Sequence, residues 1–253
     1  MKVASIFTSL DGEVTKGGPL QFSTFIRFGG CNLNCYEKEG GCDAMHSHPL
    51  FSSNYHIMTP EEIFEKVNKA SGPARFTLTG GEPLVQGYEL LELINMLEED
   101  GNEVSVETNG TIPIHSLREN TDATIVMDLK TPSTGIGVEF DLITEMNLNK
   151  LLDTDFVKVV VANQSDYLFA LGKLITQKIT GRIKNTLAQV CIGPKYAGVT
   201  PVVPPAMIVE WMKAERLWSW RLNLQLHKML WPKEVLASLK EGVSFNEAVD
   251  NEV

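Results

Sequence analysis

Apolar runs with the composition of β-strands alternate along the chain with runs that repeat at the period of a helix. Residues 21–28 (QFSTFIRF) combine aromatic and β-branched side chains, which is typical of a strand. Residues 60–70 predict a helix, because Thr59 offers an N-cap, Pro60 lies in the first turn and two glutamates follow. The same criteria predict strands at 75–79, 103–107, 124–129, 156–162, 187–193 and 221–227, and helices at 88–97, 139–151, 165–177, 205–215 and 233–241.

Strands that alternate with helices are typical of βαβ units, whose strands join a parallel sheet. About six such units predict an α/β fold with a complete or partial (β/α) barrel. No linker, repeat or low-complexity segment divides the 253 residues, so we expect a single domain over 1–253. The stretch after Val243 is acidic, and we expect it to form a short frayed tail.

Unusual residues follow four successive predicted strands. Two glycines and Cys31 come after the first strand, and residues 79–83 (TGGEP) after the second. Residues 107–110 (ETNG) follow the third strand, and residues 128–130 (DLK) close the fourth. The carboxyl ends of parallel strands lie at one edge of the sheet, where such folds carry their function. The pattern therefore predicts one site at that edge.

Composition and charge narrow the class of function. Hydrophobic residues make up 43% and charged residues 21%, as in ordinary globular proteins, and the net charge is −10. An acidic chain lacks a broad surface for phosphates, so we expect no nucleic-acid partner. The N-terminal residues have no long apolar run, and no stretch approaches the roughly 18 apolar residues of a membrane-spanning helix. We therefore expect a cytoplasmic protein with no membrane partner, whose thiols stay reduced.

Cys31, Cys35 and Cys42 lie within twelve residues of one another in a glycine-rich loop. Thiolates in such a loop suit either an iron–sulfur cluster or zinc. Cys191 lies in a predicted apolar strand, and we expect it to be a buried small residue rather than a fourth ligand. Three ligands on a cluster of four irons leave one iron open, as a catalytic metal centre requires.

Several motifs together carry a family resemblance from about Ile6 to Pro232: IFTSLDGE, FIRFGGCNLNC, GCD, TLTGGEPL, VETNG, MDLKTPSTG, FVKVVV and LQLHKMLW. The chain resembles the radical S-adenosylmethionine (SAM) enzymes and, among them, the 7-carboxy-7-deazaguanine synthases. The resemblance implies a partial or modified (β/α) barrel of the radical SAM type. It also implies a lyase that contracts the ring of 6-carboxy-5,6,7,8-tetrahydropterin to 7-carboxy-7-deazaguanine with loss of ammonia, a step of queuosine and deazapurine biosynthesis that regenerates SAM.

The resemblance implies roles for individual residues. Within a cluster-binding loop at 31–58, Cys31, Cys35 and Cys42 are implied to bind a [4Fe–4S] cluster. Arg27 falls at the arginine that binds the substrate carboxylate, which a guanidinium clamps through two parallel hydrogen bonds. SAM is implied to bind near Gly80, Gly81, Glu82, Asp128 and Lys130, and the pterin near Leu10, Asp11, Gly12, Glu13, Arg27, Thr79, Gln225 and His227. An electron donor such as flavodoxin or ferredoxin and a homodimer are the implied partners.

Two departures from the family pattern affect this loop. The usual cysteine spacing is C-x3-C-x2-C, whereas this chain has C-x3-C-x6-C. The family often places a threonine that binds Mg²⁺ two residues after the last cysteine, where this chain has Ala44. Either Mg²⁺ is held otherwise, by Asp43 or by His46 and water, or it is dispensable. Mg²⁺ takes oxygen ligands and keeps several waters, so loss of one protein ligand need not abolish its binding. Asp11, at a position where glutamine is usual, adds a carboxylate near the same pocket.

Two other functions fit part of the pattern. A glycyl-radical-enzyme activase shares the cysteine loop and the GGEP motif, but it would consume SAM. A Cys3His zinc site completed by His46 or His48 would instead stabilise a binding module. By residue type alone, Lys130 also fits a surface lysine and His227 a structural histidine.

Overall fold

The computed structural model describes residues 1–16, 18, 20–35, 42, 55–70, 72–136, 140–176 and 188–231. Its main feature is a nine-stranded sheet with the order β11-β8-β7-β6-β5-β4-β2-β1-β3. Across the sheet, the strands from β11 to β2 pair in parallel with their neighbours. At the other edge, β1 is antiparallel to both β2 and β3. The strands are β1 (Lys2–Asp11), β2 (Gln21–Phe28), β3 (His56–Ile57), β4 (Arg75–Gly80), β5 (Glu103–Thr108), β6 (Thr124–Leu129), β7 (Phe156–Val161), β8 (Gln189–Pro194) and β11 (Arg221–Leu222).

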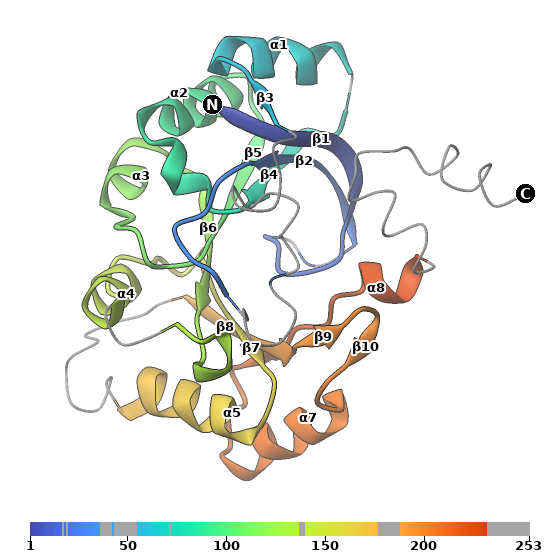
Figure 1. The fold of residues 1–253 in the computed structure, drawn as a ribbon, viewed down its shortest axis with the longest axis vertical. Helices are drawn as coiled ribbons and strands as arrows, with labels where there is room; N and C mark the ends of the chain where they lie inside the picture. The colour runs from blue at the N-terminus through green and yellow to red at the C-terminus, as the bar shows by residue number, and fades with distance from the viewer. Residues whose placement is uncertain are drawn as a thin grey trace, which may run out of the picture.

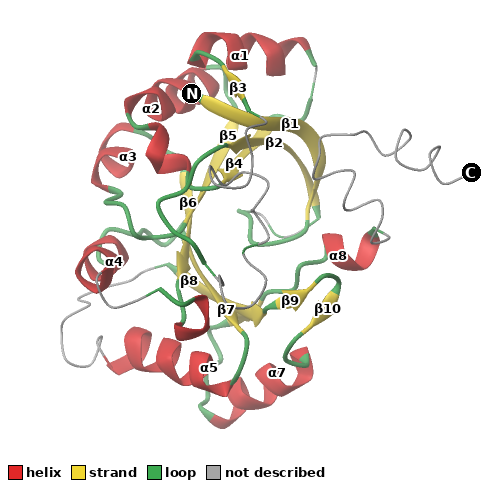
Figure 2. Ribbon diagram, viewed as in Figure 1, coloured by secondary structure: helices red, strands yellow, loops and turns green. Residues whose placement is uncertain are grey.

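The sheet curves into an arc, and the main helices cover its convex side (Figure 1). Figure 2 shows the same two layers by type of structure, with the strands on the inside. The outer helices are α1 (Pro60–Lys69), α2 (Tyr88–Glu99), α3 (His115–Asn120), α4 (Asp141–Leu148), α5 (Gln164–Leu171) and α7 (Pro205–Ala214). The short helix α8 (His227–Leu230) lies apart from them, near the open side of the arc.

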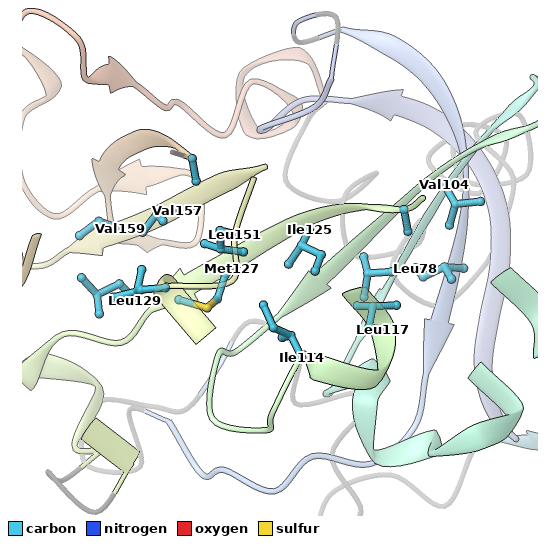
Figure 3. Packing of buried hydrophobic residues seen from close by; sticks show 14 of the residues in the cluster. Leu78, Val104, Ile114, Leu117, Ile125, Met127, Leu129, Leu151, Val157 and Val159 are labelled. Atoms are coloured by element: carbon cyan, nitrogen blue, oxygen red, sulfur yellow. The ribbon is translucent and has the colours of Figure 1, made fainter. Parts of the chain in front are cut away.

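Alternation along each strand gives the two faces of the sheet different chemistry. Leu78, Met127, Val157 and Val159 belong to the large apolar core shared with the helices (Figure 3). Successive strand residues point to opposite faces, so the residues between them point into the arc. These inward residues include Thr79, Glu107, Asp128 and Lys158. A small separate cluster of Val14, Val126, Phe156 and Cys191 packs in the interior.

Loop contacts rather than strand pairing join the two ends of the arc in the described part of the chain. The backbone N–H of Leu226 donates to the carbonyl of Gly12 at 3.0 Å. The Gln225 amide donates to the Glu13 carboxylate at 2.8 Å. The segment after β1 therefore meets the segment after β11, and the result is the predicted partial barrel.

Most predicted elements are confirmed. The helix at 60–70 is α1, where Thr59 and Glu62 form a complete capping box. The strand predicted at 221–227 is wrong beyond Leu222, because the following residues cross to the segment after β1 and His227 begins α8. The strands β1 and β3 and the helix α3 were not predicted from the sequence. The helix predicted at 233–241 and the acidic tail lie outside the described residues.

Within the described chain, none of the helices has both the length and the apolar character needed to cross a bilayer.

Candidate functional site

The three cysteines of the loop lie near one another at the carboxyl end of β2. None of these three described cysteines forms a disulfide; Cys35 is buried, and Cys31 and Cys42 are partly buried. Burial raises the pKa of Cys35 to about 11; Lys130 opposes this shift, and the neighbouring Cys42 and Cys31 thiols add to it. The described residues contain no group of three or more His, Cys, Asp or Glu that could hold a single metal ion. A cluster of several irons does not need such a group, because each thiolate binds a different iron.

The Gly80-Gly81 turn is pressed against the start of the cysteine loop. Gly80 has φ +118°, a conformation that favours glycine, and a side chain on Gly81 would collide with the carbonyl of Gly30. The backbone N–H groups of Gly81 and Glu82 donate to Phe28 at 3.0 Å and to Gly30 at 2.8 Å. These contacts fix the backbone immediately before Cys31.

Glu82 ties the turn after β4 to the end of β5. Its side chain is fully buried and accepts hydrogen bonds from the Leu84 N–H at 3.0 Å, the Thr108 hydroxyl at 2.9 Å and the Asn109 N–H at 2.6 Å. Burial raises the pKa of Glu82 to about 7, although these donors oppose the shift. Most of its acceptor capacity is therefore used within the chain.

We expect Glu82→Gln to lower the free energy of unfolding at pH 5 by about 1–3 kcal/mol, because an amide can accept at only one of the two oxygen positions. The other position would set an N–H group against a backbone N–H donor. At this pH the raised pKa of Glu82 itself costs the folded state little, since pH 5 lies close to the ordinary pKa of a glutamate. Urea unfolding measures the difference. The control is Glu65→Gln on α1, whose exposed ion pair with Lys69 contributes at most about 1 kcal/mol. Equal stability of the two variants would contradict a tying role for Glu82.

Asn109 links β5 to the cysteine loop. Its amide nitrogen donates to Asn32 at 2.8 Å and approaches the Cys31 sulfur at 3.8 Å. Its oxygen accepts from the N–H and hydroxyl of Thr111 at 2.9 and 2.7 Å. This network sets the position of Cys31 from the β5 side.

Four charged side chains of alternating sign, which we call the inner charge chain, cross the interior: Glu13, Lys158, Asp128 and Lys130. Lys130 donates to Asp128 at 2.8 Å. Lys158 lies 3.0 Å from Glu13 and 3.5 Å from Asp128. Burial acts to raise the pKa values of both acids, but the lysines outweigh it and hold both below their usual values. The inner charge chain thus runs from the neighbourhood of the cysteines to the segment after β1.

Arg27 presents a guanidinium group with one unpartnered nitrogen to the same interior. Among the described residues its buried Nη1 has no hydrogen-bond partner, and the guanidinium lies 4.6 Å from the centre of the Phe7 ring. Burial lowers the pKa of Arg27 to about 10, while Glu107 opposes the shift. Thr79 donates to Glu107 at 2.7 Å. A buried cation with a spare donor suits an anionic ligand group.

The remaining predicted site residues surround the segment after β1. The Asp11 carboxylate accepts from the Thr77 hydroxyl at 3.0 Å and the Glu13 N–H at 3.2 Å. Gly12 faces His227 so closely that a side chain on Gly12 would collide with the His227 backbone. Burial lowers the pKa of His227, so the imidazole is neutral at neutral pH. Leu10, at the end of β1, pairs with Phe22.

Asp43, Ala44, His46 and His48 lie outside the described residues, and so does every candidate Mg²⁺ ligand in the cysteine loop.

Comparisons with known proteins show the family to which the chain belongs. The model of the Radical SAM superfamily matches residues 25–143. 7-Carboxy-7-deazaguanine synthase from Clostridium acetobutylicum is 33% identical over 232 residues, which cover 91% of this chain and 96% of that protein. The chain belongs to the 7-carboxy-7-deazaguanine synthase family. A synthase of the same name from Methanospirillum hungatei is 33% identical over 91% of this chain and 85% of its own length.

A solved structure supports the fold of this family member. The crystal structure of QueE from Escherichia coli matches with a TM-score of 0.62 at 22% identity, over 88% of this chain and 92% of that chain. SuiB from Streptococcus suis bound to its precursor peptide matches with a TM-score of 0.55 at 13% identity, over 81% of this chain and 50% of that chain. The shared radical SAM fold confirms the predicted fold class.

The sequence pattern placed Glu107 and Asn109 at the edge of the sheet that carries the site but gave neither a role, and Lys158 was not predicted as a site residue. Lys158 had a usable signal, because it is a single lysine inside the apolar run FVKVVV. Glu107 had a similar one in the strand VSVET. Asn109 stands in the ETNG segment at a strand end, but its contacts with Asn32 and Cys31 were not predictable, since they depend on the close approach of two loops. Cys191 is buried, as predicted.

We expect Asp11→Asn to make this synthase chain more stable at pH 8 by about 2–4 kcal/mol and to change its stability little at pH 4. Burial, together with Glu107, raises the pKa of Asp11 to about 7. Between its ordinary pKa near 4 and this value, the folded state holds a proton that the unfolded state releases, so stability falls as pH rises. The neutral asparagine removes that loss of stability. Its amide can still form hydrogen bonds with the Thr77 hydroxyl and the Glu13 N–H. Urea unfolding of ligand-free protein at several pH values tests this; an unchanged pH dependence in the variant would contradict it.

Proposed function

We propose that this chain is a radical SAM lyase that converts 6-carboxy-5,6,7,8-tetrahydropterin to 7-carboxy-7-deazaguanine with loss of ammonia. Membership of the synthase family over 91% of the chain supports this activity. The observation in the structure that carries it is the buried Nη1 of Arg27, which has no hydrogen-bond partner among the described residues, in a guanidinium group beside an aromatic ring. A carboxylate carried by a pterin, whose pyrimidine half is flat, has the chemistry to satisfy both.

The residues at the carboxyl ends of the strands fit a [4Fe–4S] cluster and SAM. Cys31, Cys35 and Cys42 offer three thiols, the number that leaves one iron open. When bound, the cluster and SAM supply the radical chemistry of the reaction. Gly80 and Gly81 would border the amino group of SAM through backbone carbonyls, which suit the three donors of an ammonium. Glu82 would hold that turn in place.

Asp128 and Lys130 would orient the rest of SAM. Their ion pair fixes both side chains at the end of β6, while Asp128 Oδ1 has no hydrogen-bond partner in the described part of the chain. This oxygen is free to accept a hydrogen bond from a ligand hydroxyl. Its distance of 3.5 Å from Lys158 keeps it near a cation.

The chain's own groups would bind and orient the pterin. Arg27 would clamp the carboxylate, and Glu13, held ionised by Lys158, would accept hydrogen bonds from ring N–H groups. Neutral His227 offers one donor and one acceptor. Leu10, Asp11, Gly12, Thr79 and Gln225 would complete the walls, and Phe7 stacks on Phe25 with ring centroids 5.2 Å apart to keep water out.

We also propose the finer features that the family resemblance implies. These are an Mg²⁺ ion near Asp43, a flavodoxin or ferredoxin as electron donor, and a homodimer. Asp11 is already engaged by Thr77 and by the Glu13 N–H, so an Mg²⁺ ligand is better sought in the cysteine loop.

Metal analysis and SAM stoichiometry test the proposal. Anaerobically reconstituted protein should contain about four irons per chain and little zinc. Its iron–sulfur cluster should absorb light at about 400 nm. Turnover should release far less 5′-deoxyadenosine than product. Stoichiometric release of 5′-deoxyadenosine would favour a glycyl-radical-enzyme activase, and colourless protein containing zinc would favour a binding module.

A further inference from the structure

Lys158 is a buried lysine that touches both halves of the site. It lies in the middle of β7, its residue is 9% exposed, and its ammonium lies 3.0 Å from Glu13 and 3.5 Å from Asp128. Glu13 belongs to the pterin half and Asp128 to the SAM half in the assignment above. The two acids come from segments more than a hundred positions apart in the sequence, and Lys158 bridges them.

The cost of burying this charge argues for a specific use. An ammonium group taken out of water loses several kcal/mol of solvation free energy, and an apolar side chain of similar size often serves stability as well. The neighbouring inward residues Phe156 and Val126 show that this part of the interior accepts apolar side chains. Lys158 instead compensates three partly buried acids that face the candidate site: Asp128, Glu13 and Glu107. Its charge therefore serves the site rather than the packing of the core.

The two contacts of Lys158 are unequal, and this inequality allows a switch. Glu13 is within hydrogen-bond distance, whereas Asp128 Oδ1 is farther away and has no hydrogen-bond partner among the described residues. A ligand that donates to Asp128 would weaken its attraction for Lys158. The ammonium would then shift towards Glu13 and fix that carboxylate in one orientation, which lowers the cost of binding a second ligand there.

We propose that Lys158 is a positioning residue that couples the two ligands, so that SAM bound near Asp128 strengthens pterin binding near Glu13. This inference rests on the proposed function. Coupling between two binding sites is reciprocal, so the pterin must strengthen SAM binding by the same factor. The coupling between two binding sites typically changes the affinity for a ligand by about 5- to 150-fold. Because the shift of the Lys158 ammonium is small, we expect a change of about 5- to 10-fold.

Binding measurements without a reductant test the coupling apart from turnover. Calorimetry on anaerobically reconstituted protein gives the Kd of SAM with and without saturating carboxytetrahydropterin. In the parent protein the pterin should tighten SAM binding by about 5- to 10-fold. In Lys158→Met the Kd of SAM alone should stay within about 3-fold of the parent value, because Lys130 still pairs with Asp128, and the coupling factor should fall to about 1. The pterin alone should still bind, but more weakly than in the parent protein, because Glu13 loses the cation that holds it ionised. Lys158→Arg, which retains the charge, should restore part of the coupling.

Lys173→Met is the matched control. Lys173 also bridges two acids, Asp141 at 2.7 Å and Glu145 at 3.7 Å, with a side chain only 13% exposed, but it lies among the outer helices. This variant should keep the full coupling. If Lys158→Met does not fold, Lys158→Gln takes its place, since its amide can still donate to Glu13 without a charge.

The outcomes separate this inference from the assignment of function. Ligands that bind independently in the parent protein, or a coupling that survives in Lys158→Met, would overturn the role of Lys158 while leaving the function in place. A parent protein that binds SAM but not the pterin would overturn the proposed function and this inference with it.

Discussion

Cys31→Ala is expected to reduce product formation to background and to leave the reconstituted protein with much less iron than the parent. The Cys31 backbone is fixed by the Gly80-Gly81 turn, and its sulfur is approached by the Asn109 amide, so no other described thiol can take its position. A cluster with only two thiolates is weakly held. Iron content, absorbance and product yield measure the effect.

Cys191→Ala is the control for this prediction. Cys191 is a free, buried thiol in the apolar interior cluster with Val14, Val126 and Phe156. Removing its sulfur should cost about 1 kcal/mol of stability as a small cavity and leave the iron content unchanged. If Cys191→Ala lost iron while Cys31→Ala kept it, the assignment of the cluster ligands would be wrong.

Arg27→Met is expected to lower kcat/KM by about 10²- to 10³-fold while leaving the ligand-free protein at least as stable as the parent. Truncating one partner of a buried charged pair costs about 2–5 kcal/mol of binding. In the ligand-free protein, however, the buried Nη1 has no hydrogen-bond partner among the described residues. Removing the guanidinium therefore relieves the free-energy cost of desolvating an unpaired charge. Arg27→Lys should recover only part of the activity, because an ammonium cannot form two parallel hydrogen bonds with a carboxylate.

Arg118→Met is the contrasting variant. Arg118 donates to both oxygens of the fully buried Asp155, at 2.9 and 2.7 Å, far from the interior of the arc. Its loss leaves an uncompensated buried carboxylate, so we expect a loss of about 3–5 kcal/mol of stability. The folded fraction should keep the parent kcat/KM. Steady-state kinetics and urea unfolding of both variants test the contrast, and an Arg27→Met variant that lost stability but kept its activity would contradict it.

The elements that the sequence predicted well depend on local signals. Thr59 and Glu62 form a capping box whichever way the helix packs, and the motifs after β2, β4, β5 and β6 stand at strand ends. Apolar runs of five or more residues are also local signals, and they predicted most of the parallel strands. Their bounds shift by only one or two residues in the structure.

The features that the sequence did not predict depend on long-range contacts. β1 lacks a continuous apolar run because every second residue faces a polar interior, as Ser9 and Asp11 do. The strand expected at 221–227 ends early because its backbone turns to close the arc against Gly12. Lys158 and Glu13 are 145 positions apart, so no spacing along the chain indicates that they form an ion pair.

The candidate site shows the same division. Its residue types were predictable, since cysteines, paired glycines and charged residues at strand ends are conspicuous in a sequence. Which groups remain free for ligands was not predictable. The structure shows Glu82 to be engaged by three donors and Arg27 to hold a spare one, and this difference decides which of them is available to bind a substrate.

Mass-spectrometric analysis of a single anaerobic reaction tests the central claim most directly. Reconstituted protein, SAM, a reductant and 6-carboxy-5,6,7,8-tetrahydropterin should yield 7-carboxy-7-deazaguanine over many turnovers per SAM, with one ammonia released for each product formed. Protein that carries its cluster and binds SAM but leaves the carboxypterin unchanged would contradict the proposed function.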